Sequence, residues 1–303
     1  MLLSVCIPVY NGAKTIMPLV EEIRKTVKET DLEFVLVDDG SKDNSEAVCA
    51  ALAETYDEVK FISLRRNFGE HNAVMCALNY CRGDYAVIID DDFQNPPSEI
   101  LTLYHEACKG YDVVYSKYHK KRHNLFRNIG SRFNDFMATW LLRKPKDLYL
   151  SSFKVISRPV IDEIIKYKGP FPYIDGLILR VTNNFSTVYV EHSVRAEGKS
   201  NYTLGKLVSL WLNMFINFSI KPLRFMSFIG FLTSLVSLIL GISFIIEKAK
   251  NPATPLGWAS LAVIILFFGG IQMVFLGLLG EYVGKHYLEA NGTPQWVVKK
   301  EYL

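Results

Sequence analysis

Two long segments without a charged residue limit most strongly what this chain can fold into. Residues 225–246 and 253–280 contain no Asp, Glu, Lys or Arg, and the apolar part of the second runs from Trp258 to Leu279. About 20 consecutive apolar residues are enough for a helix to cross a bilayer. We therefore predict two membrane-spanning helices joined by the short loop 247–255. The alternative is a pair of buried helices in a soluble core, but soluble helices of this length usually keep a polar stripe.

The residues around these segments predict which side of the membrane the rest occupies. The first residues, MLLSVCIPVYNG, have no basic leader and too short an apolar run for a signal peptide. We expect the chain up to about residue 220 to stay in the cytosol, and two crossings to return the C-terminus to that side. The five cysteines form no CxxC pair, which suits a reducing compartment. Basic residues flank the predicted spans on the side of the termini, with a weaker pair in the loop between them: Lys221, Arg224, Lys285, Lys299 and Lys300, against Lys248 and Lys250.

The N-terminal two thirds of the chain alternates strand and helix patterns. Short apolar runs at 3–9, 34–37, 59–64, 85–89 and 112–116 alternate with segments of helical periodicity such as 14–29. This alternation predicts an α/β fold with a doubly wound, mostly parallel sheet. Ligands of such sheets bind beyond the carboxyl ends of the strands.

Carboxylates gather where two of these strands end. Asp38 and Asp39 follow one apolar run, and DDDFQNPP, which begins at Asp90, follows another. Mg²⁺ and Mn²⁺ prefer oxygen ligands and commonly use one or two carboxylates together with substrate phosphates. If the segment stays extended, Asp90, Asp92 and Gln94 point to one side. They are therefore the predicted metal ligands; a solvated strand end is the alternative for an isolated DxD.

Other phosphate-binding patterns are missing. The first strand is followed by PVYNGAK, with one glycine, where a dinucleotide-binding fold has GxGxxG. A complete P-loop, GxxxxGK[ST], is also absent, because GKS at 198–200 has Ser193 where the first glycine would stand. A phosphate would then be held through a metal on carboxylates.

Several motifs together resemble a known family. They are CIPVYNG, VLVDDGSKDNS, RRNFGEHNAVMCAL, GDYAVIIDDDFQNPP, and RAEGKSNYT followed by two apolar helices and GLLGEYVGKHY. The chain resembles family 2 glycosyltransferases, and more closely the polyprenyl-phosphate glycosyltransferases related to dolichyl-phosphate mannose synthase and the bacterial undecaprenyl-phosphate sugar transferases. The resemblance covers nearly the whole chain. It implies a GT-A-type fold and the inverting transfer of a sugar from a nucleotide-diphosphate sugar, expected to be UDP-linked, to a polyprenyl phosphate, expected to be undecaprenyl phosphate, for modification of cell-envelope glycans.

The resemblance also assigns roles by position. Pro8, Tyr10, Val37 and Asp39 would hold the base and ribose, Asp90, Asp91 and Asp92 would lie along the nucleotide, and Asp90, Asp92 and Gln94 would lie near the metal, with Asp92 also catalytic. Two positions depart from the pattern. Gly12 stands where many relatives have Glu, and Asp91 stands where they have a small Ala or Gly.

The acceptor phosphate needs cations more than a base. A phosphate monoester has a second pKa of about 6 and is mostly ionised near pH 7. Bringing it to another anion costs repulsion unless cations intervene. We predict that Arg127 and Arg195 bind it, because Arg grips phosphate oxygens in a bidentate way. Second choices are Lys117, Lys121 and Ser200; Asp147 and Asp175 are rival candidates for a base, and the KKRH cluster at 120–123 could instead attract anionic lipid headgroups.

These patterns divide the chain into four parts. Residues 1–203 form the cytosolic nucleotide-sugar transferase domain, 204–224 an amphipathic helix in the membrane interface, 225–280 the transmembrane hairpin and 281–303 a cytosolic tail. The predicted partners are the nucleotide sugar, the polyprenyl phosphate and the bilayer, with no nucleic acid; a homo-oligomer is left open. The other functions considered are transfer to another lipid acceptor, a processive polysaccharide synthase, whose QxxRW motif is absent, and a non-catalytic scaffold.

Overall fold

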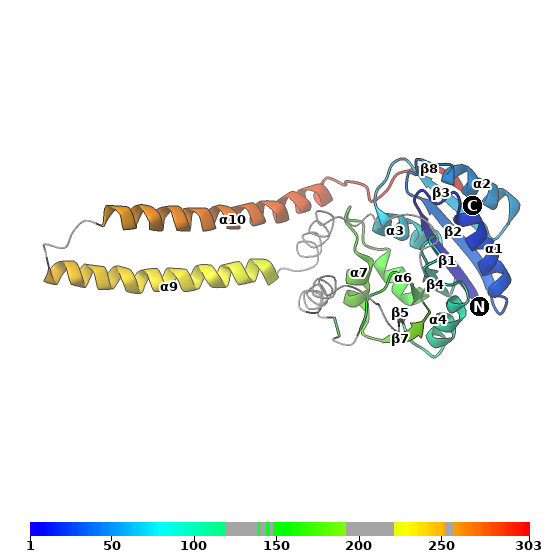
Figure 1. Cartoon of the computed structure of the whole chain (residues 1–303), viewed down its shortest axis with the longest axis horizontal. Helices are drawn as coiled ribbons and strands as arrows, with labels where there is room; N and C mark the ends of the chain where they lie inside the picture. Colours follow the sequence, from blue (N-terminus) through cyan, green and yellow to red (C-terminus); the bar gives the residue numbers. More distant parts are fainter. Residues whose placement is uncertain (119–138, 140–143, 146–147, 192–220, 252–256) are drawn as a thin grey trace. The chain divides into compact units, whose positions relative to one another are not determined.

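The computed structural model describes residues 1–118, 139, 144–145, 148–191, 221–251 and 257–303. The chain divides into two compact units: Met1–Tyr202 together with Gly292–Leu303, and Thr203–Asn291. Figure 1 shows the sheet of the first unit and the two long helices α9 and α10 of the second.

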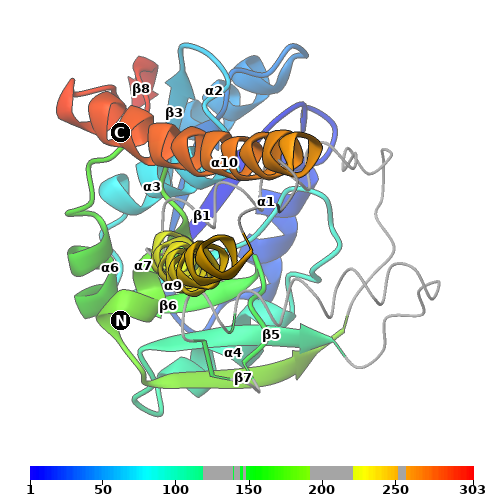
Figure 2. The same ribbon diagram turned by 90° about the vertical axis from the view of Figure 1, so that its left-hand side faces the viewer.

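An eight-stranded mixed sheet forms the centre of the first unit, in the order β7-β5-β6-β4-β1-β2-β3-β8. Strands β1, β2, β3 and β4 are mutually parallel, as the sequence predicted, whereas β6 and β8 run antiparallel to their neighbours. Figure 2 shows β5 and β7 side by side at one edge, where they pair in parallel. The strands are β1 (Leu2–Val9), β2 (Asp31–Asp38), β3 (Val59–Leu64), β4 (Tyr85–Ile88), β5 (Val113–Tyr118), β6 (Lys154–Ser157), β7 (Phe185–Val190) and β8 (Val298–Tyr302).

Helices cover both faces of the sheet because its central strands are apolar on both faces. Leu3, Val5, Ile7 and Val9 of β1 share one core cluster with the apolar faces of α1 and α4. Helix α3 contacts β1 and β2 but contributes nothing to that cluster, so it lies on the opposite face. The helices of this unit are α1 (Ile16–Thr26), α2 (Ser45–Thr55), α3 (Glu70–Tyr80), α4 (Glu99–Ala107), α6 (Arg158–Ile164) and α7 (Ile174–Val181).

The C-terminal residues return to the sheet. Strand β8 pairs antiparallel with β3, and the Tyr302 ring stacks on Phe61 with the ring centroids 5.8 Å apart. Lys299 pairs with Glu46 of α2 at 2.7 Å. The sequence pattern predicted no strand here and placed Lys299 among the membrane-flanking charges; in the structure its ammonium group forms an ion pair within the first unit.

The second unit contains two helices that are long and apolar enough to cross a membrane. They are α9 (Lys221–Lys250) and α10 (Trp258–Ala290), with candidate spans at Leu223–Ser243 and Phe267–Ala290. The first overlaps the predicted span 225–246, and α10 contains the whole of the predicted 258–279. Of the predicted interfacial segment, residues 204–220 lie outside the described part, and 221–224 open α9.

Candidate active site

Four loops meet at the carboxyl edge of the parallel strands. They follow β1, β2, β3 and β4, which are neighbours in the sheet order β4-β1-β2-β3. Backbone bonds continue past the strand ends, from Asp39 N to Val9 O at 2.9 Å and from Ile89 N to Cys6 O at 3.2 Å. The predicted gathering of polar residues at one edge of the sheet is confirmed.

Side chains tie the loops after β1 and β2 together. Asn11, which has a positive φ of 57°, receives a hydrogen bond from Lys42 N on its Oδ1 at 2.8 Å, and its own N–H donates to Ser41 Oγ at 2.9 Å. Gly12 N donates to Ser45 Oγ at 2.9 Å. These bonds fix a narrow turn on which the Tyr10 side chain stays exposed.

The carboxylate of Asp39 accepts hydrogen bonds from the protein backbone. Its two carboxylate oxygens accept the N–H groups of Phe68 at 2.7 Å and Gly69 at 2.8 Å. Burial raises its pKa to about 6 in spite of these two bonds. Asp38 accepts Ser41 N at 3.3 Å, and burial raises its pKa as well. The turn after β2 is thus joined by the hydrogen bonds of Asp39 to the loop before α3, and we call this connection the Asp39 brace.

The other residues predicted to hold the nucleotide are placed by the pairing of β1 with β2. Pro8 and Val37 face each other in the register. Val37 is fully buried and Pro8 half-buried. Their contacts with a nucleotide stay predictions.

The acidic loop, which we define as Asp90–Asn95, is not extended. It turns at Asp91 and Asp92, Phe93 has a φ of 58°, and Gln94 N donates to Asp92 Oδ1 at 3.1 Å. We predicted that Asp90, Asp92 and Gln94 point to one side if the segment is extended. Because the segment turns, strand alternation does not place these three side chains on one side. The chain leaves the strand conformation soon after β4 ends, so local turn geometry sets these directions.

The three adjacent carboxylates of this loop point to different neighbours. Asp90 Oδ2 accepts the Ser152 hydroxyl at 2.8 Å, while Asp92 is bonded to its own turn. Asp91 lies against the turn after β1: a Cβ atom built on Gly12 would stand 1.9 Å from Asp91 Oδ2. The two departures from the family pattern, at positions 12 and 91, thus lie in contact. Separating the carboxylates reduces the repulsion that three consecutive aspartates would otherwise suffer.

Glu70 is a further acidic residue of this region, which the sequence patterns did not single out. It opens α3, one residue after the Gly69 N–H that binds Asp39. Burial of the Glu70 carboxyl group among neighbouring protein atoms raises its pKa to about 7, and the negative charges of Asp90, Asp175 and Asp92 add to the rise. The sequence signal that could have identified Glu70 is its position directly after Gly69, at the start of the predicted helix.

Asp175, one of the rival candidates for a base, is bonded to neighbouring side chains, and a role as a base stays a prediction. It is buried on α7, forms an ion pair with Lys154 and accepts the Tyr115 hydroxyl at 3.1 Å. His71 packs edge-on against Tyr173 with the ring centroids 5.2 Å apart, and burial lowers its pKa to about 4.

The residues predicted to bind or activate the acceptor are mostly outside the described part of the chain: Lys121, Arg127, Asp147, Arg195 and Ser200. Lys117 is described, and its ammonium group lies 5.4 Å from the centroid of the Tyr189 ring.

The predicted metal ligands are Asp90, Asp92 and Gln94, and their role stays a prediction. Among the described residues, no three His, Cys, Asp or Glu side chains form a group that could hold a metal ion. The oxygens of Asp90, Asp92 and Gln94 have the chemistry that Mg²⁺ and Mn²⁺ prefer, and such ions commonly take their remaining ligands from substrate phosphates and water. The acidic loop fits a metal that arrives with a diphosphate.

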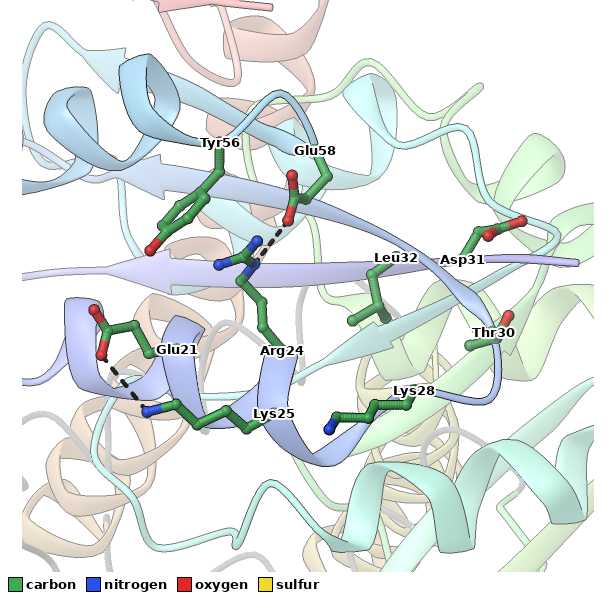
Figure 3. Close-up of a pocket in the computed structure, with 9 residues that line it drawn as sticks. All are labelled: Glu21, Arg24, Lys25, Lys28, Thr30, Asp31, Leu32, Tyr56 and Glu58. Atoms are coloured by element: carbon green, nitrogen blue, oxygen red, sulfur yellow. Dashed lines mark hydrogen bonds and ion pairs between the residues drawn. The ribbon is translucent and has the colours of Figure 1, made fainter.

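A surface hollow of about 730 Å³ lies at the other end of the sheet. Figure 3 shows its lining around Arg24 of α1 and Asp31, the residue that begins β2. Its charges largely neutralise one another, because Arg24 pairs with Glu58 at 2.7 Å and Lys25 approaches Glu21 at 4.0 Å. We assign no chemistry to this hollow.

Comparison with known proteins agrees with this geometry. The model of the family "Glycosyl transferase family 2" matches residues 4–165. The chain is 31% identical over 304 residues to the uncharacterized glycosyltransferase YkcC of Bacillus subtilis (strain 168), covering 99% of this chain and 94% of that protein. It is 32% identical over 305 residues to the undecaprenyl-phosphate 4-deoxy-4-formamido-L-arabinose transferase of Proteus mirabilis (strain HI4320), covering 98% and 93%.

Solved structures show the same fold at lower identity. Glucosyl-3-phosphoglycerate synthase of Mycobacterium tuberculosis superposes with a TM-score of 0.52 at 20% identity, over 70% of this chain and 78% of that one. The complex of that enzyme with Mn²⁺ and UDP-glucose gives a TM-score of 0.51 at 20% identity, over 71% and 75%. The predicted GT-A-like fold is confirmed.

Proposed function

This chain belongs to glycosyl transferase family 2, and we propose that it transfers a sugar from a nucleotide-diphosphate sugar to a polyprenyl phosphate, with inversion at the anomeric carbon. The observation that carries the proposal is the meeting of the Tyr10 turn and the acidic loop at one sheet edge, in a chain that continues into two membrane-length helices. The Proteus mirabilis relative, named for undecaprenyl phosphate, matches 98% of the chain and supports this acceptor.

The donor would lie across the loops after β1, β2 and β4. The exposed Tyr10 ring offers a surface for the base, expected to be uracil, beside Pro8 and the Asp39 brace. Asp90, Asp92 and Gln94 would hold Mg²⁺ or Mn²⁺, which when bound neutralises charge on the leaving nucleoside diphosphate. The protein's own contribution at this edge is to hold these oxygens in place before the donor arrives.

The acceptor phosphate would attack as an anion. It needs little help from a base near pH 7. Arg127 and Arg195 remain the residues that we propose to grip it, with Ser200 near Arg195 in sequence and Asp147 the remaining candidate for a base.

The topology of the chain supports paired membrane crossings. The first unit contains both Met1–Tyr202 and Gly292–Leu303, and β8 lies in the same sheet as β1. The chain therefore has to cross a membrane an even number of times between residues 202 and 292, if it crosses at all. Two spans by α9 and α10, with both termini and the active site in the cytoplasm, satisfy this condition. We retain the interfacial role of residues 204–224 as part of the proposal.

The test is a transfer assay with the full-length protein in membranes. Undecaprenyl phosphate is supplied with a panel of labelled nucleotide sugars, including the UDP form of 4-deoxy-4-formamido-L-arabinose, because the Proteus mirabilis relative is named for that sugar. A labelled glycolipid that mild acid releases is the expected result. A labelled polymer would point to a processive synthase, and no product with any donor would contradict the proposal.

A further inference from the structure

We propose that Ser152 and Tyr118 are positioning residues that hold the two ends of the acidic loop in the geometry needed for metal and diphosphate. This inference rests on the proposed function, and it concerns residues to which that function assigns no role. It starts from the antiparallel strand β6, which lies between β4 and β5 in the sheet.

The strand registers bring these residues together. In the β4–β6 pair, Ile88 faces Lys154, so the same register two residues further places Asp90 opposite Ser152. In the β5–β6 pair, Tyr115 faces Lys154, so three residues further Tyr118 comes opposite Ser151. The residues that precede β6 therefore lie between the exits of β4 and β5.

Hydrogen bonds join this segment to both ends of the acidic loop. At the first end, Ser152 Oγ donates to Asp90 Oδ2 at 2.8 Å. At the other end, Tyr118 OH donates to Asn95 Oδ1 at 2.8 Å and lies 3.3 Å from Ser151 Oγ. Ser116 Oγ extends the network by donating to Ser151 Oγ at 2.7 Å.

The burial of this network indicates that it is rigid. Ser116, Ser151 and Asn95 are 0%, 6% and 4% exposed. Buried polar groups that are all bonded to one another specify one arrangement, because breaking any bond leaves a buried group unsatisfied. The Asn95 end is thus fixed by the interior, whereas the Ser152–Asp90 bond lies at the surface, where it adds little stability and can act mainly by orienting a carboxylate.

The consequence for function follows from how carboxylates bind metals. A carboxylate that accepts a fixed hydrogen bond on one oxygen presents the other in a defined direction, and loss of such a partner typically lowers metal affinity or activity by about 10- to 100-fold. Removal of the Ser152 hydroxyl is therefore expected to weaken metal binding without unfolding the protein.

The experiment measures Mn²⁺ binding to the purified full-length protein in the presence of UDP, by electron paramagnetic resonance of free Mn²⁺. Ser152→Ala is expected to raise the Mn²⁺ dissociation constant by about 10-fold. Ser152→Thr, which keeps the hydroxyl, should have a dissociation constant close to that of wild type. Tyr118→Phe should give a smaller rise. The matched control is Ser186→Ala, because the Ser186 hydroxyl also donates to a carboxylate, that of Glu106, at 2.7 Å between β7 and α4; it should leave Mn²⁺ binding unchanged.

The outcomes separate this inference from the proposed function. Wild-type protein that transfers sugar and binds Mn²⁺, with Ser152→Ala binding Mn²⁺ equally well, would overturn the positioning role alone. An equal loss of Mn²⁺ binding in Ser186→Ala would also overturn it, since the effect would then be general. Wild-type protein that does not bind Mn²⁺ with UDP would overturn both the metal site and its positioning. A thermal midpoint of Ser152→Ala close to that of Ser186→Ala shows that folding is not the cause.

Discussion

The turn after β2 and the acidic loop after β4 both place aspartates at the end of a buried parallel strand, yet the structure uses them differently. Asp39 is 3% exposed, and both of its oxygens accept backbone N–H groups. Asp90 and Asp92 are half-buried; Asp90 accepts a serine hydroxyl, and Asp92 accepts an N–H of its own turn. The first arrangement holds two loops together, and the second keeps carboxylates at the protein surface. Carboxylates that look alike in the sequence thus differ in their burial and in the backbone donors that they accept, while the nucleotide contact of Asp39 stays a prediction.

The largest effect should come from the acidic loop. Asp92→Ala removes a proposed ligand and a negative charge, and we expect turnover to fall by roughly 10²- to 10³-fold, as when one group that stabilises developing charge is lost. The transfer assay measures this fall. The thermal midpoint should stay near that of wild type, because the bond from Gln94 N to Asp92 lies within a single surface turn. Near-normal turnover would remove Asp92 from the chemistry.

A substitution in the turn after β2 should instead lower the stability of the protein. Asp39→Asn can accept only one of the two N–H groups of Phe68 and Gly69, and its amide nitrogen opposes the other. A buried N–H left without a partner costs about 1–3 kcal/mol. Thermal unfolding at pH 5 in detergent should show this destabilisation. An unchanged midpoint would mean that the two hydrogen bonds of Asp39 do not stabilise the folded protein.

The same substitution should change how stability depends on pH. The pKa of Asp39 in the folded protein is about 6, above its ordinary value of 3.8, so the folded state binds this proton more tightly than the unfolded state. Protonation of Asp39 therefore stabilises the folded state fully below about pH 4. As the pH rises from about 4 to about 6 this stabilisation is lost, which lowers the free energy of unfolding by about 3 kcal/mol at most. We expect the penalty of Asp39→Asn to shrink over that interval. A penalty that is constant between pH 4 and pH 7 would contradict the raised pKa.

The smallest effect concerns the contact between the two loops. Gly12→Ala introduces a Cβ where Asp91 Oδ2 now lies, so the flexible carboxylate must move while the backbone can stay. We expect normal folding and a modest loss of UDP affinity, measured by calorimetry. In an Asp91→Gly background the same Gly12→Ala change should have no further effect, because the obstacle is gone. Equal losses in both backgrounds would show that the two positions act independently.

Much of the fold was predictable because its signals are local. The two uncharged segments predicted two long apolar helices, and both are present as α9 and α10. Apolar runs that end in polar residues predicted parallel strands with a polar carboxyl edge, and β1, β2, β3 and β4 have that arrangement. The resemblance in the motifs around Asp39 and Asp90 predicted the family that the comparisons show.

What the sequence by itself determined is therefore the helices, the parallel strands and the edge at which the acidic residues gather, since periodicity and turn residues act over a few neighbours. Only the tertiary structure decided that β6 enters antiparallel and brings Ser152 to Asp90, that β8 returns from the C-terminus to β3, and that Asp91 lies on Gly12. Ser152 and Asp90 are 62 positions apart in the chain. Local patterns do not encode which distant segments pair, because that choice depends on how the whole sheet and its covering helices pack.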